Sequence, residues 1–127
     1  MRLKDNLYTI ETRQDEYGVG TSYLIKLNPE CFIYKAHFPG KPITPGVCLV
    51  QIGKELMEDL SGQLLSLKRL KNAKFLSTVT PKESSEVKYE IVRLTEEDGE
   101  LSSKLRVASA GEMKAKISMT CRIDGRL

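Results

Sequence analysis

The chain has 127 residues, of which 40% are hydrophobic and 29% are charged, and its formal net charge is +3. This length allows one sizeable core, and the composition is that of a soluble globular protein. The mild charge does not favour nucleic-acid binding, although it is compatible with a basic patch for an acidic partner. No run of about 18 apolar residues is present, so we expect no membrane span.

The N-terminal residues and the cysteines give little sign of export or metal binding. Residues 1–6 are polar and carry no signal-peptide core, so we expect a cytoplasmic protein. Three cysteines, Cys31, Cys48 and Cys121, lie far apart without the spacing of a zinc site or a disulfide framework. Cys48 and Cys121 fall in apolar patterns and are expected to be buried. No metal and no cofactor is predicted.

The first 30 residues predict a hairpin. Residues 7–13 alternate loosely, and residues 19–27 place Tyr23, Ile25 and Leu27 on one face. Residues 15–18 (Asp-Glu-Tyr-Gly) form a plausible turn between these strands. Asn28-Pro29-Glu30 ends the second strand, and a short apolar stretch at 31–34 follows.

The stretch from His37 to Val47 is rich in turn-forming residues. It contains the only histidine, three of the five prolines and two of the nine glycines. A helix is predicted from about Gly46 to Leu60, apolar all round in its first turn and a half and therefore buried there. Its second half is expected to reach solvent through Lys54, Glu55, Glu58 and Asp59. A lone imidazole near a helix N-terminus is suited to proton chemistry.

The remainder of the chain reads as strands. Residues 64–79 predict a long strand with a bulge or bend near Leu70, and shorter strands follow at 87–93 and 101–107. Turns are predicted at 80–83, 96–99 and 110–112. Residues 113–123 alternate most cleanly, with Lys114, Lys116, Ser118, Thr120 and Arg122 opposite the apolar set. We therefore expect an α+β fold in which a curved antiparallel sheet, ending in a meander of four strands, wraps around one helix.

The motif His37-Phe38-Pro39-Gly40-x-Pro42-Ile43-x-Pro45-Gly46-Val47 closely resembles the signature of the 3-hydroxyacyl-[acyl-carrier-protein] dehydratases. The resemblance covers about residues 31–123 and includes Asn72-Ala73-Lys74-Phe75 and residues 79–83. It implies a single hot-dog domain over residues 1–127, and it implies a role in fatty-acid or polyketide-type lipid synthesis. The first 30 residues do not show the family's usual Leu-Pro-His-Arg-type opening.

The resemblance also implies roles for individual residues. His37 would take the α-proton of a 3-hydroxyacyl thioester, with its other ring nitrogen held by the backbone carbonyl of Ile43. The backbone N–H of Gly46 would bind the thioester oxygen. The family places a carboxylate fourteen residues after the histidine, supplied by the other subunit, to protonate the leaving hydroxyl.

The acid position departs from the family pattern. Gln51 stands there, and Glu55 follows one helical turn later, so the family's Glu-x-x-x-Gln is interchanged. Glutamine forms hydrogen bonds but cannot transfer a proton. Three readings remain open. Glu55 supplies the carboxylate, His37 alone shuttles the proton, or the protein binds acyl groups without dehydrating them.

Other residues are expected to contact the substrate or its carrier. Aliphatic and aromatic side chains form the core or an acyl tunnel, with Phe38, Ile43, Val47, Val50 and Phe75 as the predicted substrate contacts, joined by Ile52 and Leu56. The basic run of Lys68, Arg69, Lys71 and Lys74 is either a solvated strand face or a docking site for acyl carrier protein and its phosphopantetheine.

The sheet edges predict a homodimer, with a trimer of dimers as an open alternative. A non-catalytic relative that binds acyl carrier protein or partners a dehydratase is a second hypothesis. A hot-dog thioesterase is a weaker one, because those enzymes generally activate water with a carboxylate.

Overall fold

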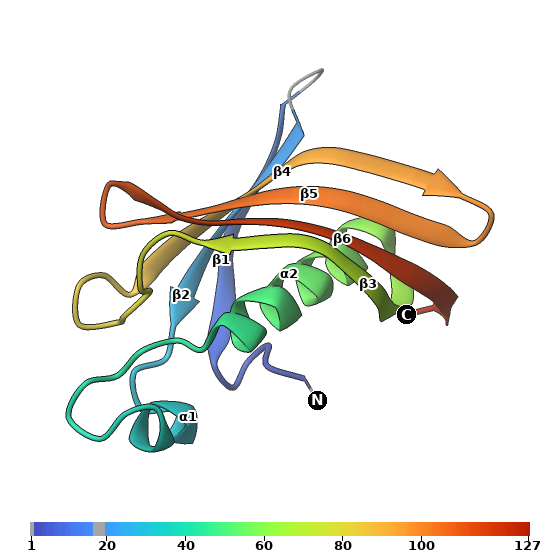
Figure 1. Cartoon of the computed structure of the whole chain (residues 1–127). Coiled ribbons are helices and arrows are strands. Elements are labelled where there is room, and N and C mark those ends of the chain that lie inside the picture. Colours follow the sequence, from blue (N-terminus) through green and yellow to red (C-terminus); the bar gives the residue numbers. More distant parts are fainter. Residues whose placement is uncertain (1, 17–19) are drawn as a thin grey trace.

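The computed structural model describes residues 2–16 and 20–127, and it confirms the expected α+β fold. A six-stranded antiparallel sheet curves around one long helix (Figure 1). In chain order the elements are β1 (Tyr8–Glu16), β2 (Gly20–Leu27), α1 (Phe32–Ala36), α2 (Gly46–Ser61), β3 (Gln63–Phe75), β4 (Glu86–Glu97), β5 (Glu100–Ser109) and β6 (Glu112–Arg126). Within the described residues, no helix has the length and apolar character needed to cross a bilayer.

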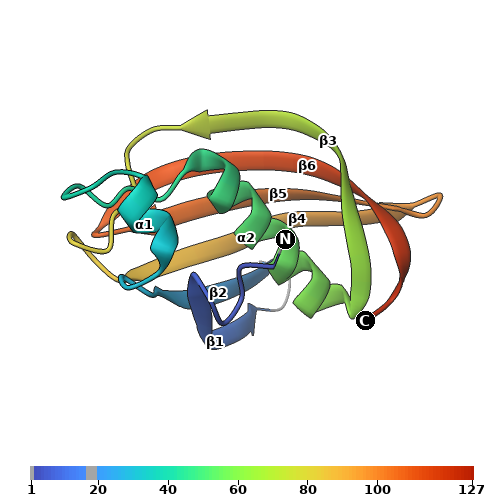
Figure 2. The same ribbon diagram turned by 90° about the horizontal axis from the view of Figure 1, so that it is seen from below.

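The strand order is β1-β2-β4-β5-β6-β3, so the predicted meander of four strands is wrong. Strands β4, β5 and β6 form a meander, but β3 pairs with β6 at the far edge. Figure 2 shows that α2 crosses the concave face of the sheet and that β3 then returns along the edge away from β1. This path places β3 beside β6 instead of beside β4. The hairpin of β1 and β2 is confirmed. Of the turn predicted at residues 15–18, Asp15 and Glu16 belong to β1, and Tyr17 and Gly18 lie outside the described residues.

Several element boundaries differ from the prediction. The short helix α1 was not predicted, because five residues are too few to show a helical period. Strand β3 ends at Phe75 instead of Val79, and β1 continues to Glu16. Register shifts at three places along β3 confirm its expected bend.

Helix α2 packs its apolar face on the inner face of the sheet. Ile52 and Leu56 are fully buried, whereas Val47 is 72% exposed in a turn that was predicted to be buried all round. The expectation that Glu55 and Glu58 reach solvent is wrong, since they are only 3% and 4% exposed. They are covered because the N-terminal segment and the start of β3 lie against this side of α2.

Gly53 lies where α2 approaches the sheet most closely. A Cβ at this position would stand 2.6 Å from Cδ1 of the fully buried Leu105. We expect Gly53→Ala to lower the free energy of unfolding by about 1–3 kcal/mol, because overpacking outweighs the better helix propensity of alanine. Denaturant titration measures this change. Gly62→Ala is a poor control because φ is +69° there, so Val47→Ala, at a 72% exposed position in the first turn of α2, is the better comparison.

Candidate functional site

Backbone hydrogen bonds hold the loop that carries His37 where its two ends approach each other. The Ile43 N–H donates to the His37 carbonyl oxygen (2.9 Å), and the Thr44 N–H donates to the carbonyl oxygen of Val79 (2.8 Å). The hydroxyl groups of Tyr34 and Thr44 share a buried hydrogen bond of 2.8 Å. These contacts hold the backbone on both sides of the histidine.

The His37 imidazole stacks on the Phe38 ring, with a centroid distance of 4.3 Å. Its Nδ1 is buried and has no hydrogen-bond partner among the residues that the structure describes. Nδ1 therefore does not form the predicted bond to the Ile43 carbonyl, and Ile43 contacts the histidine backbone through its own N–H. An unpaired buried nitrogen costs about 1–3 kcal/mol and so marks a place for a further polar group.

Gly46 opens helix α2 directly under an aromatic ring. A Cβ at Gly46 would lie 2.9 Å from Cζ of Phe75, so only glycine lets this ring close over the helix start. The first N–H groups of a helix have no intrahelical acceptor, and the helix dipole adds partial positive charge there. The start of α2, where Phe75 lies against Gly46, thus has the partial positive charge that favours an anionic ligand.

Gln51 and Glu55 form a hydrogen-bonded pair on α2. The Gln51 Nε2 donates to Glu55 Oε2 at 2.8 Å. The same oxygen accepts the Leu3 N–H at 2.7 Å, while Oε1 accepts the Lys4 N–H at 2.8 Å and the Tyr8 hydroxyl at 3.0 Å. Glu55 therefore anchors the N-terminal segment, residues 2–8, to the helix.

These four donors occupy both carboxylate oxygens of Glu55. Backbone N–H groups only donate, so the oxygens that face them act as acceptors and direct no proton toward a substrate. Burial, followed by the charge of Glu55 and the hydrogen bond to it, raises the pKa of Tyr8, which stays a donor. Sequence reasoning missed this role because residues 3–8 show no signal that they contact α2.

A polar cavity of about 300 Å³ lies beside Gln51, between α2, β3 and the two chain ends. Its wall includes Lys54, which donates to the Leu65 carbonyl oxygen at 3.0 Å, and Glu58, which accepts the Leu65 N–H at 3.0 Å. The remaining lining residues are Arg2, Gln51, Glu55, Leu64 and Asp124. Within residues 2–16 and 20–127, no group of three or more side chains has the arrangement of a metal site.

The predicted site residues fall into two groups. Around the start of α2, Phe38 lies on His37 and Phe75 lies on Gly46, while Ile43 contacts the His37 backbone. Gln51 lies about 7–8 Å from Gly46 along the helix axis. It forms the second group together with Glu55.

The predicted substrate contacts differ in exposure. Val50 is 7% exposed and belongs to the core with Ile52 and Leu56, whereas Phe38 and Phe75 are 49% and 50% exposed. The four cations of the basic run, Lys68, Arg69, Lys71 and Lys74, are exposed on the edge strand β3. Lys68 forms an ion pair with Glu100.

Comparison with known proteins places the chain among dehydratases. The model of the ApeI-like family, described as ApeI dehydratase, matches residues 12–117. A 3-hydroxyacyl-[acyl-carrier-protein] dehydratase FabZ from Clostridium acetobutylicum is 33% identical over 69 residues, 49% of each chain. FabZ from Fusobacterium nucleatum is 36% identical over 62 residues, covering 45% of this chain and 43% of the relative. The matches thus span less than half the length of these curated relatives.

Solved structures share the fold at low identity. The dehydratase heterocomplex ApeI:P from Xenorhabdus doucetiae matches with a TM-score of 0.65 and 16% identity, covering 89% of this chain and 96% of that one. A putative thioesterase, yhdA, from Lactococcus lactis matches with a TM-score of 0.67 and 15% identity, covering 99% and 100%. These likenesses show the hot-dog fold alone. Because the family model covers most of the sequence, the chain belongs to the ApeI-like dehydratase family.

Proposed function

We propose that this protein is a hydro-lyase that interconverts 3-hydroxyacyl and trans-2-enoyl thioesters carried on acyl carrier protein. The observation that carries this proposal is the imidazole of His37, held on a braced loop with a buried, unpaired Nδ1. Membership of a dehydratase family supports the same chemistry. No metal or redox cofactor is required, because the reaction moves only a proton and a hydroxyl group.

In the forward direction, His37 removes the C2 proton of the 3-hydroxyacyl thioester. The negative charge that develops on the thioester oxygen is stabilised by the N–H of Gly46 at the start of α2. The C3–O bond then breaks, and the imidazolium gives its proton to the departing hydroxyl. The products are a trans-2-enoyl thioester and one water molecule, and His37 returns to its starting state.

Both proton transfers are assigned to His37 because neither Gln51 nor Glu55 on α2 is available as an acid. Gln51 has no transferable proton, and Glu55 is committed to donors of its own chain. Gln51 is left to hold the 3-hydroxyl by a hydrogen bond, with its own amide oriented by Glu55. The family resemblance implies that the residue at this helix position comes from the other subunit, so in a homodimer Gln51 would act beside the partner's histidine.

The substrate would arrive on its carrier. The exposed cations of the basic run are suited to an acidic carrier protein and to the phosphate of phosphopantetheine. Phe38, Val47 and Phe75 offer exposed apolar surface near His37 and Gly46 for the acyl chain.

A second candidate is a subunit that binds acyl groups without catalysis, in complex with an active dehydratase. Gln51 in the acid position favours it, and so does the charge of β3, which holds four cations and no acid. Two copies paired along this strand would bring like charges together, whereas an acidic partner would not. The similar ApeI:P structure is itself a heterocomplex.

The decisive experiment is hydration of a trans-2-enoyl thioester by the purified protein. The reaction is monitored through the loss of absorbance of the conjugated enoyl group. We expect turnover by the wild type and a rate about tenfold lower for Gln51→Ala, which loses one hydrogen bond to the hydroxyl. The exposed Gln14→Ala is the matched control and should match the wild type.

Two results would contradict the proposal. Wild-type protein that binds the thioester but does not hydrate it would support the non-catalytic subunit. Release of free thiol in place of hydration would support a thioesterase. The double variant Gln51→Glu/Glu55→Gln restores the family order, and a large gain of activity there would show that the wild type lacks its general acid.

A further inference from the structure

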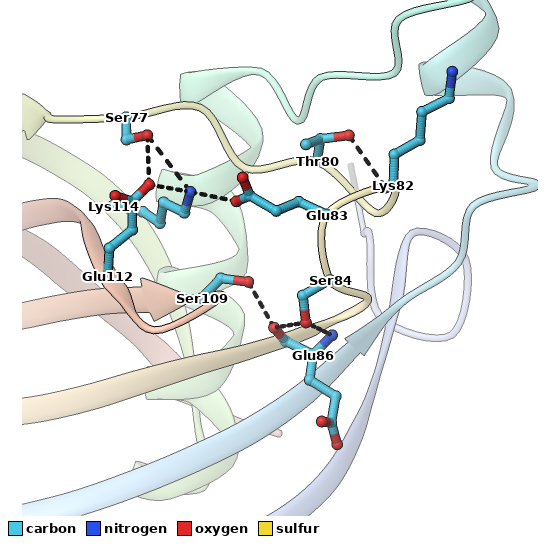
Figure 3. A network of polar contacts seen from close by, with 9 residues as sticks. All are labelled: Ser77, Thr80, Lys82, Glu83, Ser84, Glu86, Ser109, Glu112 and Lys114. Carbon is cyan, nitrogen blue, oxygen red and sulfur yellow. Dashed lines mark hydrogen bonds and ion pairs between the residues drawn. The ribbon is translucent and has the colours of Figure 1, made fainter.

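A buried lysine supports the histidine loop, residues 37–45, through the connection between β3 and β4. Lys114 on β6 is 1% exposed, although the strand pattern predicted it on the solvent side, because the connection between β3 and β4, residues 76–85, covers it. Figure 3 shows its Nζ between two carboxylates, at 2.6 Å from Glu112 Oε1 and 2.7 Å from Glu83 Oε1. Ser77 Oγ lies 3.5 Å away.

These contacts attach both ends of the β3–β4 connection to the sheet. At its start, the Leu76 N–H donates to the Lys114 carbonyl oxygen at 2.8 Å, and Ser77 Oγ donates to Glu112 Oε1 at 2.9 Å. Near its end, Glu83 accepts the Lys114 ammonium. Lys114 therefore contacts the start of the segment through its backbone carbonyl and the end of the segment through its ammonium group.

The middle of this connection holds the histidine loop. The Val79 carbonyl oxygen accepts the Thr44 N–H at 2.8 Å, and Val79 itself is 1% exposed. The Lys82 Nζ donates to the Gly40 carbonyl oxygen at 2.8 Å. Contacts thus run without a break from Lys114 to the backbone on the C-terminal side of His37.

We propose that Lys114 is a positioning residue for His37, acting through the β3–β4 connection without touching the substrate. The inference rests on the proposed function for its kinetic consequence, although the structural coupling stands independently. Catalysis depends on atomic placement, and a displacement of about 1 Å can cost a hundredfold in rate. A rigid support beneath Gly40 and Thr44 keeps the imidazole where the C2 proton must be removed.

The charges around Lys114 permit a clean test. The side chains of Glu83 and Glu112 are 49% and 53% exposed, against 1% for Lys114. Replacing the lysine with methionine keeps the aliphatic volume and leaves two carboxylates that water can solvate. The variant therefore removes the tether without leaving a buried charge unpaired.

The first measurement is amide hydrogen exchange on the full chain, comparing Lys114→Met with Lys116→Met. Lys116 lies on the same face of β6 two residues away and is exposed, so it is the matched control. We expect exchange at the Thr44 amide to become about five- to tenfold faster in Lys114→Met only. The buried Leu105 amide should be unchanged in both variants.

The second measurement is the kinetics of enoyl-thioester hydration. We expect kcat to fall about tenfold in Lys114→Met with KM nearly unchanged, because the defect is in placing the base. Glu83→Gln should change both readouts in the same direction and add little when combined with Lys114→Met. Unchanged Thr44 exchange would overturn the inference.

The two proposals fail separately. If Thr44 exchange responds to Lys114→Met but His37→Ala leaves turnover intact, then the proposed catalytic role of His37 is wrong and only the structural coupling remains. If exchange responds and kcat does not, the coupling has no part in positioning the base.

Discussion

His37→Ala is expected to lower the rate of enoyl-thioester hydration by about 10²–10⁴-fold, the usual contribution of a positioned acid–base group. The loss should lie at the upper end, because the proposed mechanism assigns both proton transfers to His37. The fold should tolerate the change, since His37 is only partly buried and its Nδ1 makes no hydrogen bond among the described residues.

The measurement combines steady-state hydration with thermal unfolding of the same samples. Lys41→Ala is the matched control, because its exposed side chain lies in the same loop and only its backbone closes the turn with Phe38. That variant should hydrate the thioester at close to the wild-type rate. Undiminished turnover by His37→Ala would refute the proposed mechanism, whatever the effect on stability.

Glu55→Gln is expected to lower the free energy of unfolding by about 2–4 kcal/mol, because hydrogen bonds to a charged acceptor contribute roughly 1.5–3 kcal/mol each. The amide group of glutamine would replace one acceptor oxygen with a donor. That donor would then face the N–H groups of Leu3 or Lys4. The N-terminal segment would lose its anchor on α2.

Urea titration gives the stability change, and activity per folded molecule separates stability from chemistry. The exposed Glu11→Gln on β1 is the control and should change stability by less than about 0.5 kcal/mol. If Glu55→Gln kept its stability and lost all turnover, Glu55 would be the missing general acid after all.

Local patterns predicted the strands and the central helix well, because each depends on residues close together in sequence. The alternation of residues 113–123 gave β6, and the glycine after Asp98 marked the turn between β4 and β5. The pairing of β3 with β6 was not predictable in this way. This pairing depends on the direction that the chain takes after α2, and no local sequence pattern predicts that direction.

The same division holds for the candidate site. The motif around His37 led to the loop, the start of α2 and the family. It did not reveal that Glu55 is buried, because its donors come from residues 3, 4 and 8, about fifty positions away. Nor did it identify Lys114, since a lysine in an alternating strand normally points to water.

The pairing of Gln51 with Glu55 has a consequence for how such sequences diverge. Two glutamates at these positions would set carboxylates side by side, and two glutamines would leave the N–H groups of Leu3 and Lys4 poorly matched. Either single replacement therefore passes through a less stable protein. A glutamine at position 55 would face the same N–H groups whether position 51 carries glutamine or glutamate, so a lineage that restores the family order must also release its N-terminal segment from the helix.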